Sequence, residues 1–226
     1  MTLLVLPIGG SAQRIFGLPK FMLPVSEKDS LIRMHVKGAL AAGVEQVVII
    51  GRTFNIGLLT DHLLGFKDVT FVALSEQTAT MNETLVKGIS SVDYASDCIV
   101  ALADTFYLNY DYQEIYAELL SAPNKTLGLF PIRSEQFGKL GQVSFDNNGL
   151  VLDVPDKNPE CKFPFAWGNM KVPIEFIRTL DIELPHIGYS VRDAVVLGES
   201  FSTRIFNCSY FDCGTFAEYQ LLLKII

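Results

Sequence analysis

Short apolar runs alternate with amphipathic stretches over the first 130 residues of the chain. The runs are residues 3–8, 45–50, 69–74, 98–102 and 126–132. Runs of this length, bounded by polar or glycine-containing segments, are typical of strands that are buried on both faces of a parallel sheet. The pattern therefore predicts five strands in the first part of the chain.

The segments between these runs place apolar residues at helical spacing. Ser30 precedes one such stretch and can cap a helix, and Gly43 follows the last turn and can end it. Further helices are predicted over residues 56–63, 80–89 and 112–120. Strands that alternate with helices form right-handed βαβ units, so we expect an α/β fold: a Rossmann-like, mostly parallel sheet sandwiched by helices.

The second half of the chain has a different pattern. Residues 141–146 and 150–154 flank Asn147-Asn148-Gly149, which predicts a hairpin with a turn that needs positive φ. A strand is predicted at 165–172, and helices at 191–197 and 216–225. With no linker or repeat, residues 1–226 are expected to form a single domain whose second half adds a small β-rich lobe.

Composition and charge narrow the functional classes. Hydrophobic residues make up 49% of the 226 residues and charged residues 19%, which is typical of a globular protein. The net charge of −7 argues against a nucleic-acid partner. No apolar run approaches the roughly 20 residues of a membrane span, and the four cysteines show no metal-binding or disulfide spacing, so a cytoplasmic location without membrane contact is expected.

The densest chemical signal follows the first strand. Gly9 and Gly10 allow the backbone to approach a ligand closely, and successive N–H groups there can form an anion site. Arg14 and Lys20 add two cations suited to a polyphosphate. The segment contains neither GxxxxGK[ST] nor GxGxxG. Asp104 ends another apolar run, and because ligands sit at the carboxyl ends of parallel strands, it is expected to face the same site.

The loop resembles the signature of the sugar-phosphate nucleotidyltransferase (NDP-sugar pyrophosphorylase) family, roughly Leu-x-Ala-Gly-x-Gly-x-Arg, a spacer and Pro-Lys. Ala12 stands where the family usually has glycine, and the short spacer before Pro19 is similar to the uridylyl- and cytidylyltransferase branches. The resemblance implies that Arg14 and Lys20 are catalytic. It also implies that the nucleotide is bound by Pro7, Ile8, Gly9, Gly10, Ser11 and Ala12.

Three later segments carry the same resemblance in the same order. Residues 76–80, Glu-Gln-Thr-Ala-Thr, are similar to the base-binding Glu-Gln-x-Gly-Thr, so Gln77 and Thr80 are expected to bind a pyrimidine nucleotide, UTP or CTP. An amide offers the donor and acceptor that a pyrimidine edge needs. The segments around Asp104 and Asp212 resemble the family's "Gly-Asp" and "Trp-x-Asp-x-Gly-Thr" motifs. They imply that Asp104 and Asp212 bind Mg²⁺, a cation that prefers oxygen ligands.

The resemblance also implies an acceptor site in the second half. The Gly141 segment and the Asp-Lys pair at 156–157 are similar to the family's "Gly-Val-Val … Glu-Lys-Pro" hairpin, with aspartate in place of glutamate and Asn158 inserted before proline. The segment 167–169 stands where relatives line the sugar pocket. The expected acceptor-binding residues are Gly141, Asp156, Lys157, Trp167 and Asn169.

These motifs predict a Mg²⁺-dependent nucleotidyltransferase that joins a nucleoside triphosphate to a sugar 1-phosphate or similar phosphorylated acceptor and releases pyrophosphate. Residues 1–135 would form the nucleotide-binding half and residues 136–226 the acceptor-binding half, with a role in sugar-nucleotide and polysaccharide biosynthesis.

Two alternatives remain open: a cytidylyltransferase acting on a polyol or amino-alcohol phosphate, and a non-catalytic nucleotide or sugar-phosphate sensor. A glycosyltransferase is less favoured because residues 104–106 lack an Asp-x-Asp. The resemblance leaves room for a homo-oligomer. No acid–base partner is evident for His35, His62 or His186.

Overall fold

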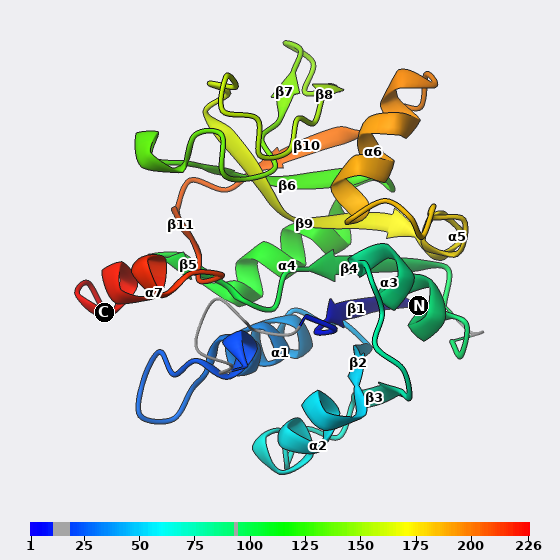
Figure 1. The fold of residues 1–226 in the computed structure, drawn as a ribbon, viewed down its shortest axis with the longest axis vertical. Coiled ribbons are helices and arrows are strands. Elements are labelled where there is room, and N and C mark those ends of the chain that lie inside the picture. Colours follow the sequence, from blue (N-terminus) through cyan, green and yellow to red (C-terminus); the bar gives the residue numbers. More distant parts are fainter. Residues whose placement is uncertain (11–18, 93–94) are drawn as a thin grey trace.

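A seven-stranded sheet forms the centre of the computed structural model, which describes residues 1–10, 19–92 and 95–226. The strand order is β10-β6-β9-β4-β1-β2-β3, which Figure 1 shows from top to bottom. β9 runs antiparallel to its neighbours β4 and β6, whereas the other neighbouring pairs are parallel. The strands are β1 (Thr2–Pro7), β2 (Gln46–Arg52), β3 (Val69–Leu74), β4 (Asp97–Ala101), β6 (Thr126–Pro131), β9 (Phe165–Pro173) and β10 (Ser202–Ile205).

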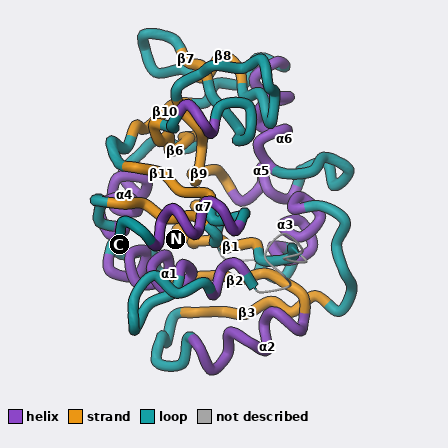
Figure 2. Tube along the Cα trace, turned by 60° about the vertical axis from the view of Figure 1, so that its left-hand side comes forward, coloured by secondary structure: helices purple, strands orange, loops and turns teal. Residues whose placement is uncertain are grey.

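Helices cover both faces of this sheet (Figures 1 and 2). One face packs against α1 (Leu31–Ala41), α2 (Thr53–His62) and α4 (Tyr112–Ser121), and the other against α3 (Met81–Ile89), α5 (Ile174–Arg178) and α6 (Ile187–Val196). Alternate residues of β1 point to opposite cores: Leu4 and Leu6 join the first, and Leu3 and Val5 the second. This two-sided burial is why the strands read as continuous apolar runs. The predicted α/β sandwich is confirmed.

The ends of α1 follow the predicted capping. The Ser30 hydroxyl accepts a hydrogen bond from the Arg33 amide, which satisfies one of the unpaired N–H groups of the first turn. Gly43, just beyond the helix, has a φ of 95°, a conformation that glycine adopts without steric strain. Both residues therefore set the length of α1 from the local sequence.

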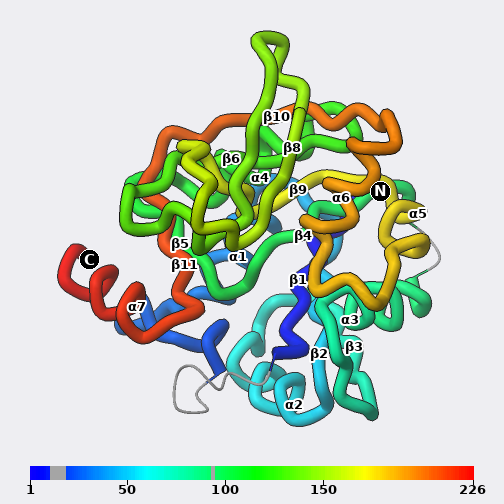
Figure 3. Tube along the Cα trace, turned by 45° about the horizontal axis from the view of Figure 1, so that its top comes forward, coloured from blue at the N-terminus to red at the C-terminus, as the bar shows by residue number. Residues whose placement is uncertain are grey.

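The second half of the chain completes the main sheet. β9 lies between β4 and β6, and β10 forms the edge beside β6. The part that stands apart is the hairpin of β7 (Ser144–Phe145) and β8 (Val151–Asp153), which projects from the molecule in Figure 3. Its turn has Gly149 at a φ of 77°, as the Asn-Gly signal predicts. α5 is an additional helix, and α6 begins four residues earlier than the predicted 191.

A second, unpredicted pair of strands lies beside the main sheet. β5 (Thr105–Leu108) pairs antiparallel with β11 (Ser209–Asp212), and α7 (Phe216–Leu223) follows. Short 3-10 helices occur at Lys20–Met22 and Ser134–Gln136. Within the ranges described, no helix combines the length and apolarity needed to cross a membrane.

His35 on α1 is fully buried behind β5, and both of its ring nitrogens are hydrogen-bonded; Nε2 also lies 3.4 Å from the Thr105 hydroxyl. Its Nε2 lies 3.2 Å from the carbonyl oxygen of Thr105 and its Nδ1 2.6 Å from the hydroxyl of Tyr116. A carbonyl can only accept, so Nε2 carries the proton and Nδ1 accepts from the tyrosine. Burial lowers the pKa of His35 from 6.5 to about 4, which keeps the ring neutral.

This buried histidine should make stability fall as pH is lowered. Below pH 6.5 the unfolded chain protonates His35 and the folded protein does not, so the loss between pH 7 and pH 5 should be about 2 kcal/mol. In His35→Gln, whose amide can replace both hydrogen bonds and does not titrate, that part of the pH dependence should disappear. Urea unfolding of both proteins at pH 7 and pH 5 measures the difference. Equal losses in both would contradict the assignment.

Candidate nucleotide and acceptor site

A cavity of about 290 Å³ lies beyond the carboxyl end of β1, at the start of α3. It brings together the glycine loop and the 76–80 segment, which are about 70 positions apart in the sequence. Its lining consists of Pro7, Gly9, Gly10, Gln77, Thr78, Ala79, Thr80, Met81 and Thr84. Five of the expected nucleotide-binding residues therefore line one cavity. Ile8 does not: its side chain is 4% exposed and its amide bonds to Ile50 in the sheet.

Three of the predicted residues of the glycine loop, Ser11, Ala12 and Arg14, lie outside the described residues. The two glycines before them have different environments. A Cβ on Gly9 would stand 2.6 Å from the Thr84 hydroxyl oxygen and 3.1 Å from that of Thr78, which leaves no space for a side chain. A Cβ on Gly10 would meet no described atom within 4 Å. Gly9 thus lets the loop pack on α3, and Gly10 leaves its backbone open to the cavity.

Thr78 and Thr84 were missed by the sequence analysis. Their hydroxyls are 2.6 Å apart, and that of Thr84 also donates to the carbonyl of Thr80. Thr80 caps α3 by accepting from the Glu83 amide, and its hydroxyl donates to Ile182. The hydroxyl of Thr80 therefore makes its hydrogen bonds within the protein, whereas Gln77 is exposed at the cavity. The four-residue spacing of Thr80 and Thr84, one helical turn, was the sequence signal that could have placed Thr84 beside Thr80.

The proposed metal carboxylates meet at one end of the β5–β11 pair. Asp212 pairs with Thr105 in the strand register, and the Cys213 amide donates to the carbonyl of Asp104 at 2.9 Å. Lys20 reaches the same point, with its Nζ 3.7 Å from Asp104 Oδ2. The pairing of β5 with β11 brings residues 104 and 212 together, and Lys20 joins them from the 3-10 helix Lys20–Met22.

The charge balance at this point suits a divalent cation. The pKa of Asp212 is raised to about 6, first by burial and then by the neighbouring carboxylate of Asp104. Lys20 lowers this pKa, but by less than Asp104 raises it. The Gly214 amide donates to Asp212 Oδ1 at 2.9 Å and holds the side chain in place. No group of three or more histidine, cysteine or acidic side chains that could hold a metal occurs in the described part of the chain. Two carboxylates fit Mg²⁺, which commonly takes its other ligands from phosphates and water.

The expected acceptor residues gather around Asp156. Gly141 forms an isolated bridge with Asp156, and Lys157, with a φ of 47°, has its Nζ 4.0 Å from Asp156 Oδ2. Trp167 lies against Gly141 so closely that a Cβ there would be 2.3 Å from the indole Nε1. Burial alone would raise the pKa of Asp156, but His186, Lys157 and Tyr189 lower it overall. Four of the five residues therefore lie in one cluster.

Asn169 lies on the opposite face of β9 from this cluster. Gly128 pairs with Asn169 and Leu129 with Trp167, so β9 contains one extra residue, Gly168, between them. Such a bulge reverses the faces of the residues beyond it. The Asn169 amide donates to the hydroxyl of buried Tyr107, and its side chain is 0% exposed. Two-residue spacing alone would have put Trp167 and Asn169 on one face.

His186, for which no partner was evident in the sequence, is paired with Asp156. Its Nε2 lies 3.1 Å from Asp156 Oδ2, and its ring caps α6 by accepting from the Gly188 amide. The two residues are 30 positions apart, and no local motif links them. The sequence therefore offered no signal for this contact.

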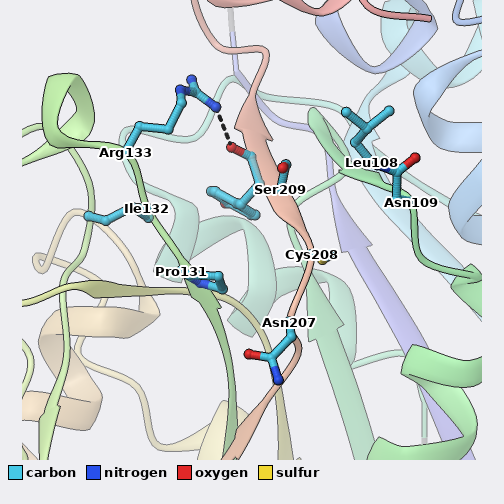
Figure 4. A pocket seen from close by; sticks show the side chains of 9 residues that line it. Leu108, Asn109, Pro131, Ile132, Arg133, Asn207, Cys208 and Ser209 are labelled. Atoms are coloured by element: carbon cyan, nitrogen blue, oxygen red, sulfur yellow. Dashed lines mark hydrogen bonds between the residues drawn. The ribbon is translucent and has the colours of Figure 1, made fainter.

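A second cavity, of about 420 Å³, lies at the other end of the β5–β11 pair (Figure 4). Its lining residues include Asn109, Asn207 and Arg133, and none is a motif residue. The Arg133 guanidinium donates to the carbonyl of Tyr210 at 3.2 Å and to Glu218 at 2.6 Å, so its charge is used within the protein. This cavity is separate from the motif residues despite its larger volume.

Comparison with known proteins finds solved structures of similar fold but no similar sequence. No protein-family model matches the sequence, and no curated protein is significantly similar to it. A putative glucose-1-phosphate thymidylyltransferase from Bacillus anthracis, solved with a sucrose, has a TM-score of 0.82 at 15% identity over 100% of this chain and 95% of that one. A UTP-bound UGPase from Acinetobacter baumannii has a TM-score of 0.76 at 15% identity, over 99% of this chain and 92% of that one.

A third similar structure, UDP-glucose pyrophosphorylase complexed with UDP-glucose, has a TM-score of 0.73 at 16% identity, over 99% of this chain and 97% of that one. The fold of this chain is thus the fold of sugar-phosphate nucleotidyltransferases, as the resemblance of its motifs predicted. The likeness spans nearly the full length of both chains in each case. At these identities it defines the fold, and the activity is argued separately below.

The cost of ionising Asp212, which comes from its burial and from the neighbouring Asp104, should be measurable in the free energy of unfolding. Because the folded-state pKa of Asp212 is raised, its ionised form disfavours folding above about pH 6, and this penalty vanishes as pH falls. Asp212→Asn keeps the acceptor for the Gly214 amide and removes the charge. At pH 7.5 without divalent cations, it should raise the free energy of unfolding by about 1–2 kcal/mol.

Chemical denaturation at pH 7.5 and pH 5 is the measurement. The gain should shrink at pH 5, where wild-type Asp212 is already protonated, and an exposed acid, Asp68→Asn, provides the matched control. A destabilised Asp212→Asn at pH 7.5 would contradict the unfavourable environment inferred for the ionised carboxylate.

Proposed function

We propose that this chain is a nucleotidyltransferase that condenses a nucleoside triphosphate with a sugar 1-phosphate or similar phosphorylated acceptor and releases pyrophosphate. The observation that carries the proposal is the meeting of Asp104, Asp212 and Lys20 at a single point. In this proposal, residues 1–135 hold the nucleotide and residues 136–226 supply the acceptor site.

The reaction is an in-line attack by an acceptor phosphate oxygen on the α-phosphorus of the triphosphate. Phosphoryl transfer of this kind depends on positioning and charge neutralisation more than on covalent catalysis. Asp104 and Asp212 would hold Mg²⁺, which supplies positive charge to the phosphates when bound. Lys20, together with Arg14, would stabilise the charge that develops on the α-phosphate and on the departing pyrophosphate.

The backbone of the glycine loop would bind the phosphates, and Gln77 would hydrogen-bond the base. A pyrimidine is favoured because an amide matches its donor and acceptor edge. Two of the similar structures, one UTP-bound and one complexed with UDP-glucose, support the same base class. On the acceptor side, Lys157 would contact the phosphate, and Gly141, Asp156 and Trp167 the sugar. A cytoplasmic location is part of the same proposal.

The test is pyrophosphate release with Mg²⁺, each of four nucleoside triphosphates and a panel of phosphorylated acceptors that includes glucose 1-phosphate. One nucleotide–acceptor pair should turn over, and Asp104→Asn and Lys20→Met should each reduce kcat about 10²–10³-fold, because each removes a group that neutralises transition-state charge. Lys28→Met, an exposed lysine outside the site, is the control and should leave kcat unchanged.

Undiminished turnover in Asp104→Asn would refute the metal assignment. Turnover only with CTP and a polyol or amino-alcohol phosphate would favour the cytidylyltransferase alternative. Nucleotide binding by calorimetry, without pyrophosphate release from any pair, would identify a sensor of the same fold.

A further inference from the structure

His186 connects the first turn of α6 to the carboxylate of Asp156. Nδ1 accepts from the Gly188 amide at 3.1 Å, so the ring proton must be on Nε2, which donates to Asp156 Oδ2 at 3.1 Å. The contact is shielded from solvent, since the side chains of His186 and Asp156 are 14% and 7% exposed. The backbone of α6 thus fixes both the tautomer and the orientation of the ring.

Two further aromatic rings surround this pair. The His186 ring lies 5.8 Å from that of Trp167 and 4.8 Å from that of Tyr189, measured between centroids. The Tyr189 hydroxyl also hydrogen-bonds Asp156. Asp156 is therefore held by a donor at the N-cap of α6 and by a second donor in the first turn of that helix.

One polar group of the cluster is left without a partner. The indole N–H of Trp167 is buried and makes no hydrogen bond with any described residue. A Cβ on Gly188 would be 2.9 Å from the indole nitrogen and 3.0 Å from the His186 ring, so Gly188 is required for the close approach of the two rings. A buried donor without a partner is unfavourable unless a ligand or water satisfies it. A hydroxylated ligand offers an acceptor for this N–H and a donor for Asp156.

We propose that His186 is a positioning residue that orients the Asp156 carboxylate to accept a hydrogen bond from a hydroxyl of the acceptor. This inference rests on the proposed nucleotidyltransferase function. It narrows the acceptor to the phosphate of a hydroxylated sugar that carries no amino group. An amino-alcohol phosphate fits less well, because the Lys157 ammonium, 4.0 Å from Asp156 Oδ2, would repel a second cation.

Two substitutions separate this role from helix capping. His186→Asn keeps a short side-chain acceptor for the Gly188 amide but does not reach Asp156, whereas His186→Gln reaches Asp156 but loses the cap. We expect His186→Asn to raise the acceptor KM about 10- to 100-fold, with kcat and the nucleotide KM changed less than about threefold. His186→Gln should retain an acceptor KM nearer to wild type and lower Tm instead.

A double substitution tests whether His186 acts through Asp156. Asp156→Asn should itself raise the acceptor KM, and adding His186→Asn should produce no further increase, because the two act on the same hydrogen bond. Steady-state kinetics with UTP or the preferred triphosphate, varying glucose 1-phosphate or the best sugar 1-phosphate of the panel, gives all four values.

Each outcome bears on the inference separately from the function. An active wild type with an unchanged acceptor KM in His186→Asn would overturn the role of His186 and leave the nucleotidyltransferase assignment intact. Additive effects in the double variant would also overturn it. An active wild type that prefers an amino-alcohol phosphate would refute the acceptor class, and a wild type silent with every pair would overturn both proposals.

Discussion

The pairing of β5 with β11 is the contact on which the candidate site depends. It places Asp212 beside the segment that follows β4, so that two partly buried carboxylates separated by more than 100 positions lie close together. Burial and the charge of Asp104 both disfavour the ionised form of Asp212, and Lys20 offsets only part of this cost. A structure that keeps two carboxylates close together is suited to bind a cation there, because the positive charge attracts both carboxylates and removes their repulsion.

The two ends of the site are built in the same way. At the proposed nucleotide end, Thr80 caps α3 and a glycine, Gly9, packs against the hydroxyls of Thr78 and Thr84. At the proposed acceptor end, His186 caps α6 and Gly188 packs against Trp167. In both places a helix start on the same face of the sheet carries the polar groups, and a glycine removes the side chain that would prevent close packing.

The strands and most helices were predictable because their signals are local. Two-sided burial makes each parallel strand a continuous apolar run, and caps such as Ser30 and Gly43 mark the helix ends. The strands β5 and β11 escaped prediction because they are four residues each and pair with each other across 100 positions. The bulge at Gly168 escaped for a similar reason: the extra residue is defined by its register against β6.

By itself, the sequence determined the alternation of strands and helices, the glycine loop with its cations, and the acids at 104 and 212, because each of these depends on the order of neighbouring residues. Only the tertiary structure decided which groups share a site. It paired His186 with Asp156, committed the Thr80 hydroxyl to a cap, and turned Asn169 away from Trp167. These outcomes depend on strand register and helix placement, which distant parts of the chain fix together.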